Sequence, residues 1–271
     1  MRLAIWNEPT AEFLVSGFLS GAAPSDVEIV RGSRAECERR LRAGLVDVAL
    51  VPALSVLRDT EALDALPAVA LSTWDYPFAR LFTREKLDRP IRSLAVDPRY
   101  AQEALVARII LSEHYGAEPA LKPYETPTAK ELLAAGEDAA LIIGVDTPGL
   151  QTPRYAMDLG QEWYELTNYP MVWGLFAVRK GEADERFARI LRDAVAASDE
   201  QRDLWLQTRE TYPELHSFYL ENLRVRLDDL ALASLTKFGD YLYFYGVTEE
   251  TPLLPLISIA DDDEDERRPL L

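Results

Sequence analysis

Two apolar stretches decide the fold, Met1-Arg-Leu-Ala-Ile-Trp-Asn-Glu-Pro-Thr10 and Leu45-Val-Asp-Val-Ala-Leu-Val-Pro52. Each is a short apolar run that ends in polar or proline-bearing residues, after which a helical pattern begins. Such runs are typical of buried parallel strands, and ligands of open α/β sheets bind beyond the carboxyl ends of these strands. We therefore expect residues 7–10 and the turn after Pro52 to form one wall of a cleft.

The first ninety residues predict alternating strands and helices. The expected strands are at 2–6, 27–30, 47–51, 68–71 and 78–83, and the expected helices are at 12–19, 33–43 and 54–58. Thr10 and Ser33 are placed to cap the first two helices, and Gly44 is placed to end the second. A β-α-β-α-β order implies right-handed crossovers and a parallel sheet.

A second unit of the same order begins near Pro90. Its expected strands are at 93–96, 120–122 and 138–144, and its helices are at 101–115 and from Thr126, the expected N-cap. Residues 155–163 and 173–179 are expected to form a strand, a loop and a returning strand. From Glu182 to about Tyr245 the pattern is helical, with breaks near Ser198, Pro213 and Arg226.

These patterns predict an α/β fold of two lobes, a hinged clamshell with a helical C-terminal return. The first lobe would hold residues 1–88 and 178–250, and the inserted second lobe residues 89–177. The crossings would lie near 86–91 and 171–178, and a ligand would bind between the lobes. Residues 251–271 are expected to form a mobile tail, because a run of acidic residues at 261–266 is typical of solvated, disordered chain.

The composition excludes several classes of function. A formal net charge of −17 opposes a nucleic-acid partner and an anionic membrane surface through long-range repulsion. The single cysteine, Cys37, excludes an intrachain disulfide, and the two histidines, His114 and His216, stand far apart, so we expect no metal and no cofactor. No leader or transmembrane run is present, which favours a cytoplasmic protein; the oligomeric state stays open.

Seven short motifs, spread over roughly residues 1–250, match the pattern of a known family: Met1-Arg-Leu-Ala-Ile-Trp-Asn7, Gly44-Leu-Val-Asp-Val-Ala-Leu-Val-Pro52, Ala107-Arg-Ile-Ile-Leu111, Ala140-Leu-Ile-Ile-Gly144, Asp158-Leu-Gly-Gln-Glu-Trp163, Leu235-Thr-Lys-Phe238 and Tyr245-Gly-Val-Thr-Glu249. Through them the chain resembles the chorismate dehydratase-type proteins of menaquinone biosynthesis by the futalosine pathway, which have a periplasmic-binding-protein-like (type II) fold of two lobes. The Asp158 to Trp163 segment is the most distinctive. The resemblance implies a lyase that dehydrates chorismate to 3-[(1-carboxyvinyl)oxy]benzoate.

This sequence differs from the family's pattern at the positions that the family uses for catalysis and ligand binding. Asn7 matches the first Asn of the family's Asn-x-x-Asn pattern, but Thr10 stands where the family has an Asn implicated in catalysis. Ala53 replaces the usual Ser after the strand-ending proline, and the segment from Asp97 to Glu103 replaces a Ser/Thr-rich loop that grips the ligand. In this chain the Gly144-Val-Asp146 segment also has a different spacing from the family's Gly-Asp.

The candidate site residues are those expected at strand ends and helix starts around the cleft. Asn7 and Thr10 are the candidate catalytic residues, although an Asx turn and a helix cap are the alternatives. The candidate substrate-binding residues are Trp74, Tyr76, Arg80, Asp97, Arg99, Tyr100, Gln102 and Asn168. Arg80, Arg84 and Arg99 could bind carboxylates, and the start of the helix at Ala101 could add a backbone anion site.

Two hypotheses of different classes therefore stand side by side. The first is the chorismate dehydratase-like lyase, in which Asn7 and Thr10 orient the substrate and its own carboxylate acts as the base. The second is a non-catalytic binding protein of the same fold for another small ligand, favoured by the departures above. Convergence of Arg80, Arg84 and Arg99 on the cleft would favour a dicarboxylate ligand, whereas solvent-facing arginines would remove the lyase's main electrostatic support.

Overall fold

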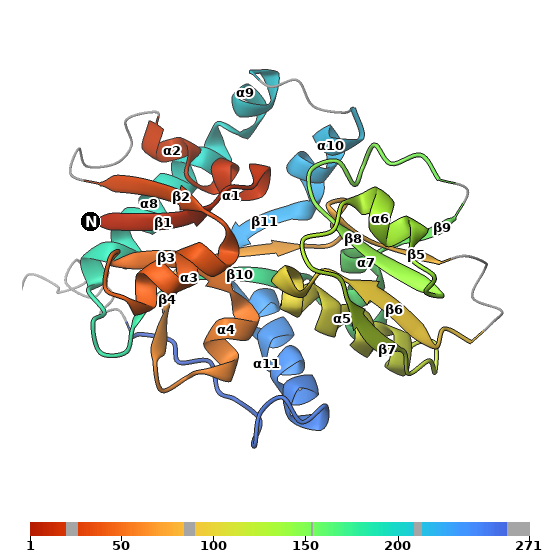
Figure 1. The fold of residues 1–271 in the computed structure, drawn as a ribbon. Coiled ribbons are helices and arrows are strands. Elements are labelled where there is room, and N and C mark those ends of the chain that lie inside the picture. Colours follow the sequence, from red (N-terminus) through yellow and green to blue (C-terminus); the bar gives the residue numbers. More distant parts are fainter. Residues whose placement is uncertain (20–26, 84–89, 153, 209–212, 259–271) are drawn as a thin grey trace, which may run out of the picture.

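Two β-sheets organise the protein, as the computed structural model shows for residues 1–19, 27–83, 90–152, 154–208 and 213–258. The first sheet has the order β11-β4-β10-β3-β1-β2 and the second the order β7-β6-β8-β5-β9. In Figure 1 the first sheet lies on the left and the second on the right, each with its own helices. This is the α/β architecture of two lobes that the sequence predicts.

The first sheet is mixed. Its strands are β1 (Arg2–Trp6), β2 (Glu28–Gly32), β3 (Val48–Pro52), β4 (Leu63–Thr73), β10 (Met171–Arg179) and β11 (Leu223–Arg226). β1 pairs in parallel with β2 and β3, whereas β10 runs antiparallel between β3 and β4, and β11 runs antiparallel to β4. β10 is buried along almost its whole length, which agrees with its apolar sequence and central place.

The second sheet is mixed as well. Its strands are β5 (Ala79–Thr83), β6 (Ser93–Val96), β7 (Ala120–Pro123), β8 (Ala139–Ile143) and β9 (Tyr155–Asp158). β6 pairs in parallel with β7 and β8, whereas β5 is antiparallel to both β8 and β9. The carboxyl ends of β6 and β8 face the first lobe.

Helices cover both sheets. The first lobe carries α1 (Pro9–Leu14), α2 (Ser16–Leu19), α3 (Arg34–Arg42), α4 (Ala53–Arg58), α8 (Glu185–Glu200), α9 (Arg202–Gln207), α10 (Pro213–Ser217), a π-helix (Phe218–Asn222) and α11 (Asp229–Phe244). The second lobe carries a 3₁₀ turn (Pro98–Tyr100), α5 (Ala101–Glu113), α6 (Ala129–Ala134) and α7 (Leu159–Thr167). None of the helices in these described segments is long and apolar enough to cross a membrane.

The expected lobe boundaries are displaced. β5 was placed in the first lobe, but it pairs with β8 and β9 of the second sheet, and β10 belongs to the first sheet from Met171 onward. The chain therefore crosses between sheets at residues 74–78 and 168–170, not near 86–91 and 171–178. The apolar run of β5 looks the same in either sheet, so only its pairing partners decide its lobe. Residues 86–89 and the acidic run at 261–266 lie outside the described residues.

Several local predictions need correction. α1 begins at Pro9 with Glu8 as its N-cap, so Thr10 lies inside the helix and does not cap it. α6 is capped by Thr128, through a capping box with Glu131, and not by Thr126. The predicted Ser33 cap of α3 is confirmed, and Gly44 after α3 has a φ of +68°, as its predicted role in ending that helix requires.

Two further elements differ from the expected ones. The expected loop after β9 is the helix α7, and the break near Arg226 is the strand β11, which adds to the edge of the first sheet. A short strand between two long helices is hard to separate from a loop by periodicity, because its partner β4 is distant in sequence.

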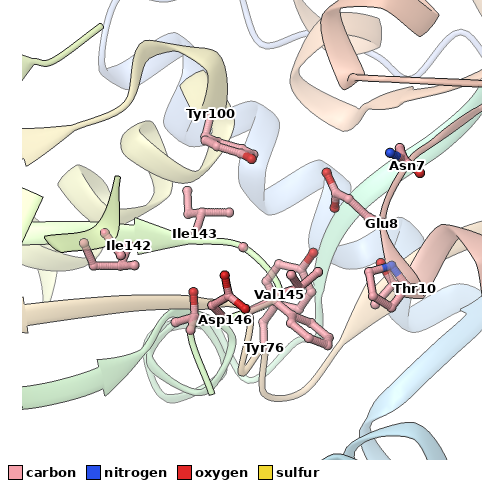
Figure 2. A pocket seen from close by; sticks show the side chains of 14 residues that line it. Asn7, Glu8, Thr10, Tyr76, Tyr100, Ile142, Ile143, Val145 and Asp146 are labelled. Carbon is pink, nitrogen blue, oxygen red and sulfur yellow. The ribbon is translucent and has the colours of Figure 1, made fainter. Parts of the chain in front are cut away.

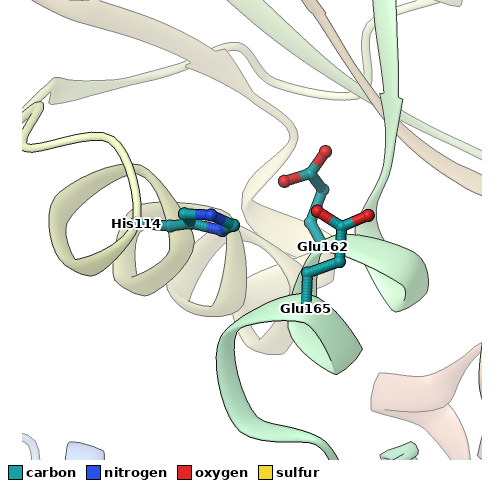
Figure 3. A group of neighbouring side chains, drawn as sticks. All are labelled: His114, Glu162 and Glu165. Atoms are coloured by element: carbon teal, nitrogen blue, oxygen red, sulfur yellow. The ribbon is translucent and has the colours of Figure 1, made fainter.

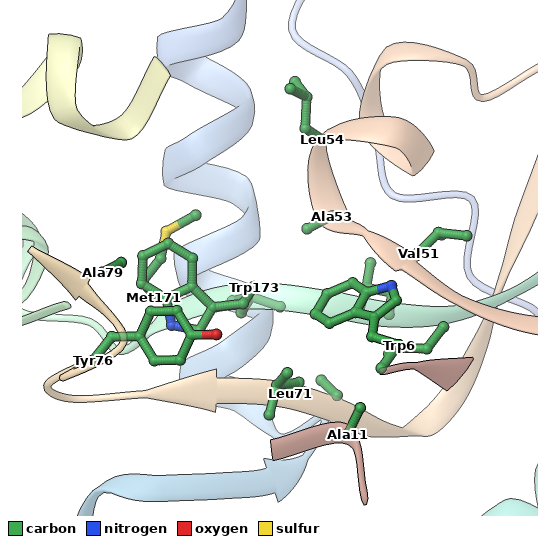
Figure 4. Close-up of a cluster of buried hydrophobic side chains, with 14 of the residues drawn as sticks. Trp6, Ala11, Val51, Ala53, Leu54, Leu71, Tyr76, Ala79, Met171 and Trp173 are labelled. Atoms are coloured by element: carbon green, nitrogen blue, oxygen red, sulfur yellow. The ribbon is translucent and has the colours of Figure 1, made fainter. Parts of the chain in front are cut away.

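Aromatic packing joins the two lobes beneath the cleft. Tyr76, in the first crossing, stacks on Trp173 of β10 with ring centroids 4.5 Å apart (Figure 4). The Trp173 indole N–H donates to the Thr73 hydroxyl over 2.8 Å. The residue after Trp173 is glycine, Gly174. A Cβ at this position would lie 2.6 Å from the Trp6 ring, so a larger residue would not fit without a shift of that ring. This aromatic layer therefore fixes the first crossing against the first sheet.

Candidate functional site

A pocket of about 300 Å³ lies between the lobes, at the carboxyl ends of β1 and β8 (Figure 2). The first lobe supplies the segment after β1, the crossing supplies two aromatic residues, and the second lobe supplies the ends of β8 and of the 3₁₀ turn. The lining residues are Asn7, Glu8, Pro9, Thr10, Tyr76, Phe78, Tyr100, Ala129, Ile142, Ile143, Gly144, Val145, Asp146 and Thr147. The volume is at the lower end of the range for small-molecule sites.

The two candidate catalytic residues both line this pocket. Asn7 follows β1 directly, its side chain is exposed, and its backbone N–H donates to the Gly32 carbonyl over 2.9 Å. Thr10 is 1% exposed, and its hydroxyl makes no hydrogen bond of normal geometry within the described part of the chain. A buried hydroxyl without a partner is costly unless a ligand or water satisfies it. The Thr10 hydroxyl lies in the pocket lining beside the Tyr76 phenol, where a bound ligand could satisfy it.

Tyr76 contributes the other hydroxyl beside Thr10. Its ring is 1% exposed, and burial raises the pKa of its hydroxyl, reinforced by Glu8 and opposed by Arg34 and Thr10. The phenol is therefore neutral at physiological pH. A neutral phenol can donate a hydrogen bond to a ligand oxygen, but it does not act as a base.

The pocket is acidic. Glu8 and Asp146 line it from opposite lobes, and no Lys or Arg is among its lining residues in the described part of the chain. Two carboxylates facing one cavity repel an anion and attract a hydroxyl or ammonium donor.

Arg34 lies directly behind Glu8. Its Nε and Nη2 donate to the two oxygens of Glu8 over 2.8 and 3.0 Å, and its Nη1 donates to Glu103 of the opposite lobe. Its guanidinium also lies over the rings of Trp6 and Tyr100, 4.4 and 5.2 Å from their centroids. Because two carboxylates and two aromatic rings already contact its guanidinium, Arg34 links the two lobes and does not face a ligand.

This ion cluster is buried. Arg34 is 5% exposed and Glu103 is fully buried, with one Glu103 oxygen, Oε2, lacking a partner in the described chain. Burial opposes the charge on Arg34, but Glu103 and Glu8 outweigh it and raise the guanidinium's pKa. One cation against two carboxylates leaves the cluster of Arg34, Glu8 and Glu103 with a net charge of −1.

Gln102 forms a second link between the lobes. Its side-chain oxygen accepts from the Leu54 N–H over 2.8 Å, and its amide nitrogen donates to the carbonyls of Val172 and Trp173 over 3.2 and 3.1 Å. The substrate contact expected at Gln102 stays a prediction. In this structure its side chain links the second lobe to backbone groups of the first.

A smaller cavity of about 130 Å³ lies on the other side of Arg34. It is lined by Arg34, Ala35, Glu38, Pro52, Leu54, Ser55, Arg58, Arg99, Tyr100, Ala101, Gln102 and Glu103. Tyr100 lines both cavities, so the predicted ligand contact at this residue fits either one. The Arg34 cluster and Tyr100 divide the cleft into an acidic and a more basic part.

The predicted arginines do not converge on the acidic pocket. Arg99 is 53% exposed and pairs with Asp97, whose carboxylate also accepts from the Arg99 backbone N–H over 3.0 Å. Arg80 does not line the pocket; burial raises the pKa of Asp75 and of Asp158, and the charge of Arg80 only opposes this rise. Arg84 lies outside the described residues. The electrostatic support expected for a dicarboxylate is therefore absent among the described arginines.

Trp74 and Asn168 also lie away from the pocket lining. Trp74 packs edge-on against Tyr164 with centroids 5.2 Å apart, and Arg224 lies over its ring. Asn168 is the exposed C-cap of α7, with a φ of +62° that asparagine tolerates better than most residues. The packing of Trp74 and the cap position of Asn168 account for both residues without a ligand.

The segment from Asp158 to Trp163 holds the first crossing in place. Asp158 Oδ1 accepts from the N–H groups of Gly160, Gln161 and Tyr76, the last over 2.6 Å. A Cβ on Gly160 would lie 2.7 Å from the backbone of Asp75, so glycine is required for this approach. Trp163, fully buried, packs on Phe238 of α11. This motif positions Tyr76 and does not itself line the pocket.

The half-buried Glu8 and the buried Arg34 and Glu103 were not among the predicted site residues. Each follows a strand end or lies in the first turn of a helix, which is where ligand sites of α/β folds form. That position is a usable signal, but charged residues there are also common on solvated surfaces. The sequence alone does not show that the three side chains meet.

Comparisons with known proteins support this architecture. A family model described as menaquinone biosynthesis matches residues 1–243. Protein AF1704 from Archaeoglobus fulgidus superposes with a TM-score of 0.71 at 19% identity, over 91% of this chain and 97% of that chain. The alkanesulfonate-binding protein SsuA from Xanthomonas axonopodis pv. citri, bound to MOPS, gives 0.63 at 14% identity, over 95% and 97%.

A third solved structure carries the name of the fold itself. The CA3427 gene product of Candida albicans, described as having the generic periplasmic binding protein structural fold, gives a TM-score of 0.56 at 13% identity, over 97% of this chain and 98% of that chain. At these identities the likenesses show the fold alone, and the predicted periplasmic-binding-protein-like fold is confirmed.

Proposed function

The chain belongs to the menaquinone biosynthesis family, which supports a role in menaquinone synthesis, and we propose that it performs this role by binding a small cyclic metabolite between its lobes. The observation that carries the proposal is the pocket itself, which both lobes build around Asn7, Thr10 and Tyr76. SsuA, of the same fold, is named for the small molecule it binds. Aromatic walls and a few polar groups suit a ring with hydroxyl substituents.

The enzymatic form of this proposal is dehydration of chorismate to 3-[(1-carboxyvinyl)oxy]benzoate, as the family resemblance implies. The position of Thr10 favours it, because a buried hydroxyl of the pocket lining stands where the resembled family has a catalytic Asn. Thr10 and Asn7 would orient the substrate, and the Tyr76 phenol would donate a hydrogen bond to one of its oxygens. The substrate's own carboxylate would take the ring proton while the ring hydroxyl leaves, and proton and hydroxyl together depart as water as the ring becomes aromatic. Exclusion of water by the closed lobes would favour this step.

The acidic lining favours the second candidate, a non-catalytic binding protein for a less anionic ligand. Chorismate carries two carboxylates, and Glu8 and Asp146 would repel both. A neutral ring with hydroxyl groups, or one bearing an amine, would donate to these carboxylates. The two candidates share the pocket and differ in the charge of the ligand.

Incubation of the purified protein with chorismate, followed by chromatography for the enolpyruvyl-oxybenzoate, separates them. Thr10→Ala and Asn7→Ala test the pocket, and Thr236→Ala, at an exposed position of α11, is the matched control. Product that is lost in Thr10→Ala and kept in Thr236→Ala supports the lyase. No product above a protein-free sample, together with no calorimetric binding of chorismate, excludes chorismate.

Binding of neutral and amine-bearing cyclohexene polyols, measured by calorimetry, then tests the second candidate. Binding that weakens in Thr10→Ala supports a small ligand in this pocket. Failure of acidic, neutral and amine-bearing rings alike would overturn the proposal of a cyclic ligand.

A further inference from the structure

His114, Glu162 and Glu165, none of which lines either cavity of the cleft, form a cluster of potential metal ligands (Figure 3). His114 is the C-cap of α5, and the two glutamates lie on α7. One ligand atom from each residue lies within 4.8 Å of the others. Residues three apart share a helix face, so both carboxylates project toward the same imidazole. The sequence predicts no metal site because the histidines are distant from each other, but here the partners of His114 are glutamates.

Neighbouring donors hold both carboxylates without neutralising them. The Tyr115 hydroxyl donates to Glu162 Oε2 over 2.5 Å, and the Gln161 amide donates to Glu165 Oε1 over 3.1 Å. Neither glutamate has an Arg or Lys partner within 4.0 Å in the described part of the chain. Such outer donors orient carboxylate ligands in metal sites.

The two glutamates bring their carboxylates close together in a place that is partly closed to solvent. Glu162 is 9% exposed, and one oxygen of Glu162, one oxygen of Glu165 and one ring nitrogen of His114 lie within 4.8 Å of one another. A mostly buried carboxylate beside a second one is stabilised by a positive charge that both can share. A divalent ion between the two helices would supply that charge.

The donor set selects the class of ion. One imidazole nitrogen and two carboxylate oxygens suit Zn²⁺ and its neighbours, whereas Mg²⁺ and Ca²⁺ prefer oxygen ligands alone. Zinc ligands at about 2.0–2.2 Å in a tetrahedron stand about 3.4 Å apart, so the side chains must close slightly. His114 and Glu165 are exposed and can rotate to do so, and water would complete the coordination.

We propose that His114, Glu162 and Glu165 bind one divalent transition-metal ion of the zinc class, which fastens the end of α5 to α7. An ion at this place would also affect the cleft, because both helices carry residues that hold the cleft together. The first turn of α5 carries Gln102 and Glu103, which link the lobes, and Asp158, the N-cap of α7, holds the backbone of Tyr76. The ion would thus brace the two helices that frame the second lobe's side of the cleft. This inference does not depend on which ligand the pocket binds.

Metal titration of the full chain tests the site. The protein is freed of any histidine tag, stripped with a chelator and titrated with Zn²⁺ by calorimetry, with Mg²⁺ as the comparison ion. Co²⁺ provides a direct readout, because its visible absorption reports the coordination geometry. We expect one Zn²⁺ per chain, no comparable binding of Mg²⁺, and a Tm raised by several degrees with zinc.

The other histidine gives a matched control. His216 is exposed on α10, so His114→Ala should weaken Zn²⁺ binding at least tenfold and abolish the Co²⁺ spectrum, whereas His216→Ala should leave both unchanged. Glu162→Gln and Glu165→Gln should each weaken binding as well. Because His114 is exposed, the metal-free Tm of His114→Ala should match that of the parent chain. Zinc binding that is absent, or equal in His114→Ala and the parent, would overturn the proposal.

Discussion

The two cavities in the cleft differ in charge although they share a wall. The larger is lined by Glu8 and Asp146, whereas the smaller is lined by three arginines with Glu38 and Glu103. Arg34 and Tyr100 stand between them. The fold creates a cleft at the strand ends, but a few side chains decide which ligand charge each part accepts. In this chain the buried cation is already bound to two carboxylates, so it divides the cleft and does not recruit an anion.

Removal of the dividing cation should have the largest effect. Arg34→Met leaves Glu103 buried without its partner and should lower the free energy of unfolding by about 3–5 kcal/mol. Urea unfolding at pH 7 measures this loss of stability. Adding Glu103→Gln should recover a substantial part of the loss, because the uncompensated charge is then gone. A loss below about 1 kcal/mol in the single variant would mean that the cluster is not a buried ion pair.

The second link between the lobes should matter less. Gln102→Leu removes the acceptor of the buried Leu54 N–H and should cost about 1–3 kcal/mol in the same measurement. Gln151→Leu, at an exposed position, is the control and should be nearly neutral. Equal stability of the two variants would contradict the role of Gln102 in closure.

The acidity of the larger cavity can be reduced directly. Asp146→Asn removes one negative charge and should strengthen the binding of chorismate, or of any dicarboxylate that enters, by about 1 kcal/mol, roughly fivefold. Calorimetry at low ionic strength measures the change, and added salt should shrink it. Asp203→Asn, exposed on α9, changes the net charge equally and should have no such effect. If both variants behave alike, the charge of the pocket lining is not what selects the ligand.

The crossing behind the pocket should respond to pH. Burial, followed by the charge of Asp158, raises the pKa of Asp75 from 3.8 to about 6. The folded state then binds more protons than the unfolded state between these values, so its stability falls as pH rises from about 4 to above 6. Asp75→Asn should remove this dependence, so its stability relative to the parent should be greater at pH 7 than at pH 4. If the difference in stability between Asp75→Asn and the parent is the same at pH 4 and pH 7, the raised pKa of Asp75 is contradicted.

The smallest effect is expected at the edge of the basic cavity. Arg99→Ala breaks an ion pair with Asp97 in which the arginine is 53% exposed, and it should cost less than about 1 kcal/mol of stability. Thermal unfolding of this variant beside Arg34→Met contrasts an exposed pair with a buried one. A loss as large as that of Arg34→Met would mean that Arg99 is tied into the fold more firmly than its exposure indicates.

The element types were largely predictable because their signals are local. Apolar runs such as Leu3 to Trp6, and the Ser33 capping box of α3, specify strands and helices without reference to the rest of the chain. The failures have non-local causes. The lobe to which β5 belongs depends on its pairing with β8 and β9, and β11 is a strand only because β4 offers an edge.

The candidate site was predictable in place but not in composition. Asn7, Thr10, Tyr76 and Tyr100 do line the larger cavity, as residues at strand ends should, although their roles there stay predictions. Gln102 and Arg99 were assigned to a ligand, but their own protein partners bind them. A polar residue at a strand end can face a ligand, a neighbour or solvent, and its type does not distinguish these.

The sequence by itself determined the two-lobe α/β fold, the resemblance to its family and the strand ends where a ligand would bind. These properties follow from periodicity, capping and short motifs, which are encoded over a few neighbouring residues. Only the tertiary structure decided the lobe boundaries, the ion cluster of Arg34, Glu8 and Glu103, the acidic lining, and the meeting of His114 with two glutamates. The physical reason is that a buried charge or a metal ligand is defined by its partners, and these partners lie 26 to 69 residues away within the Arg34 cluster.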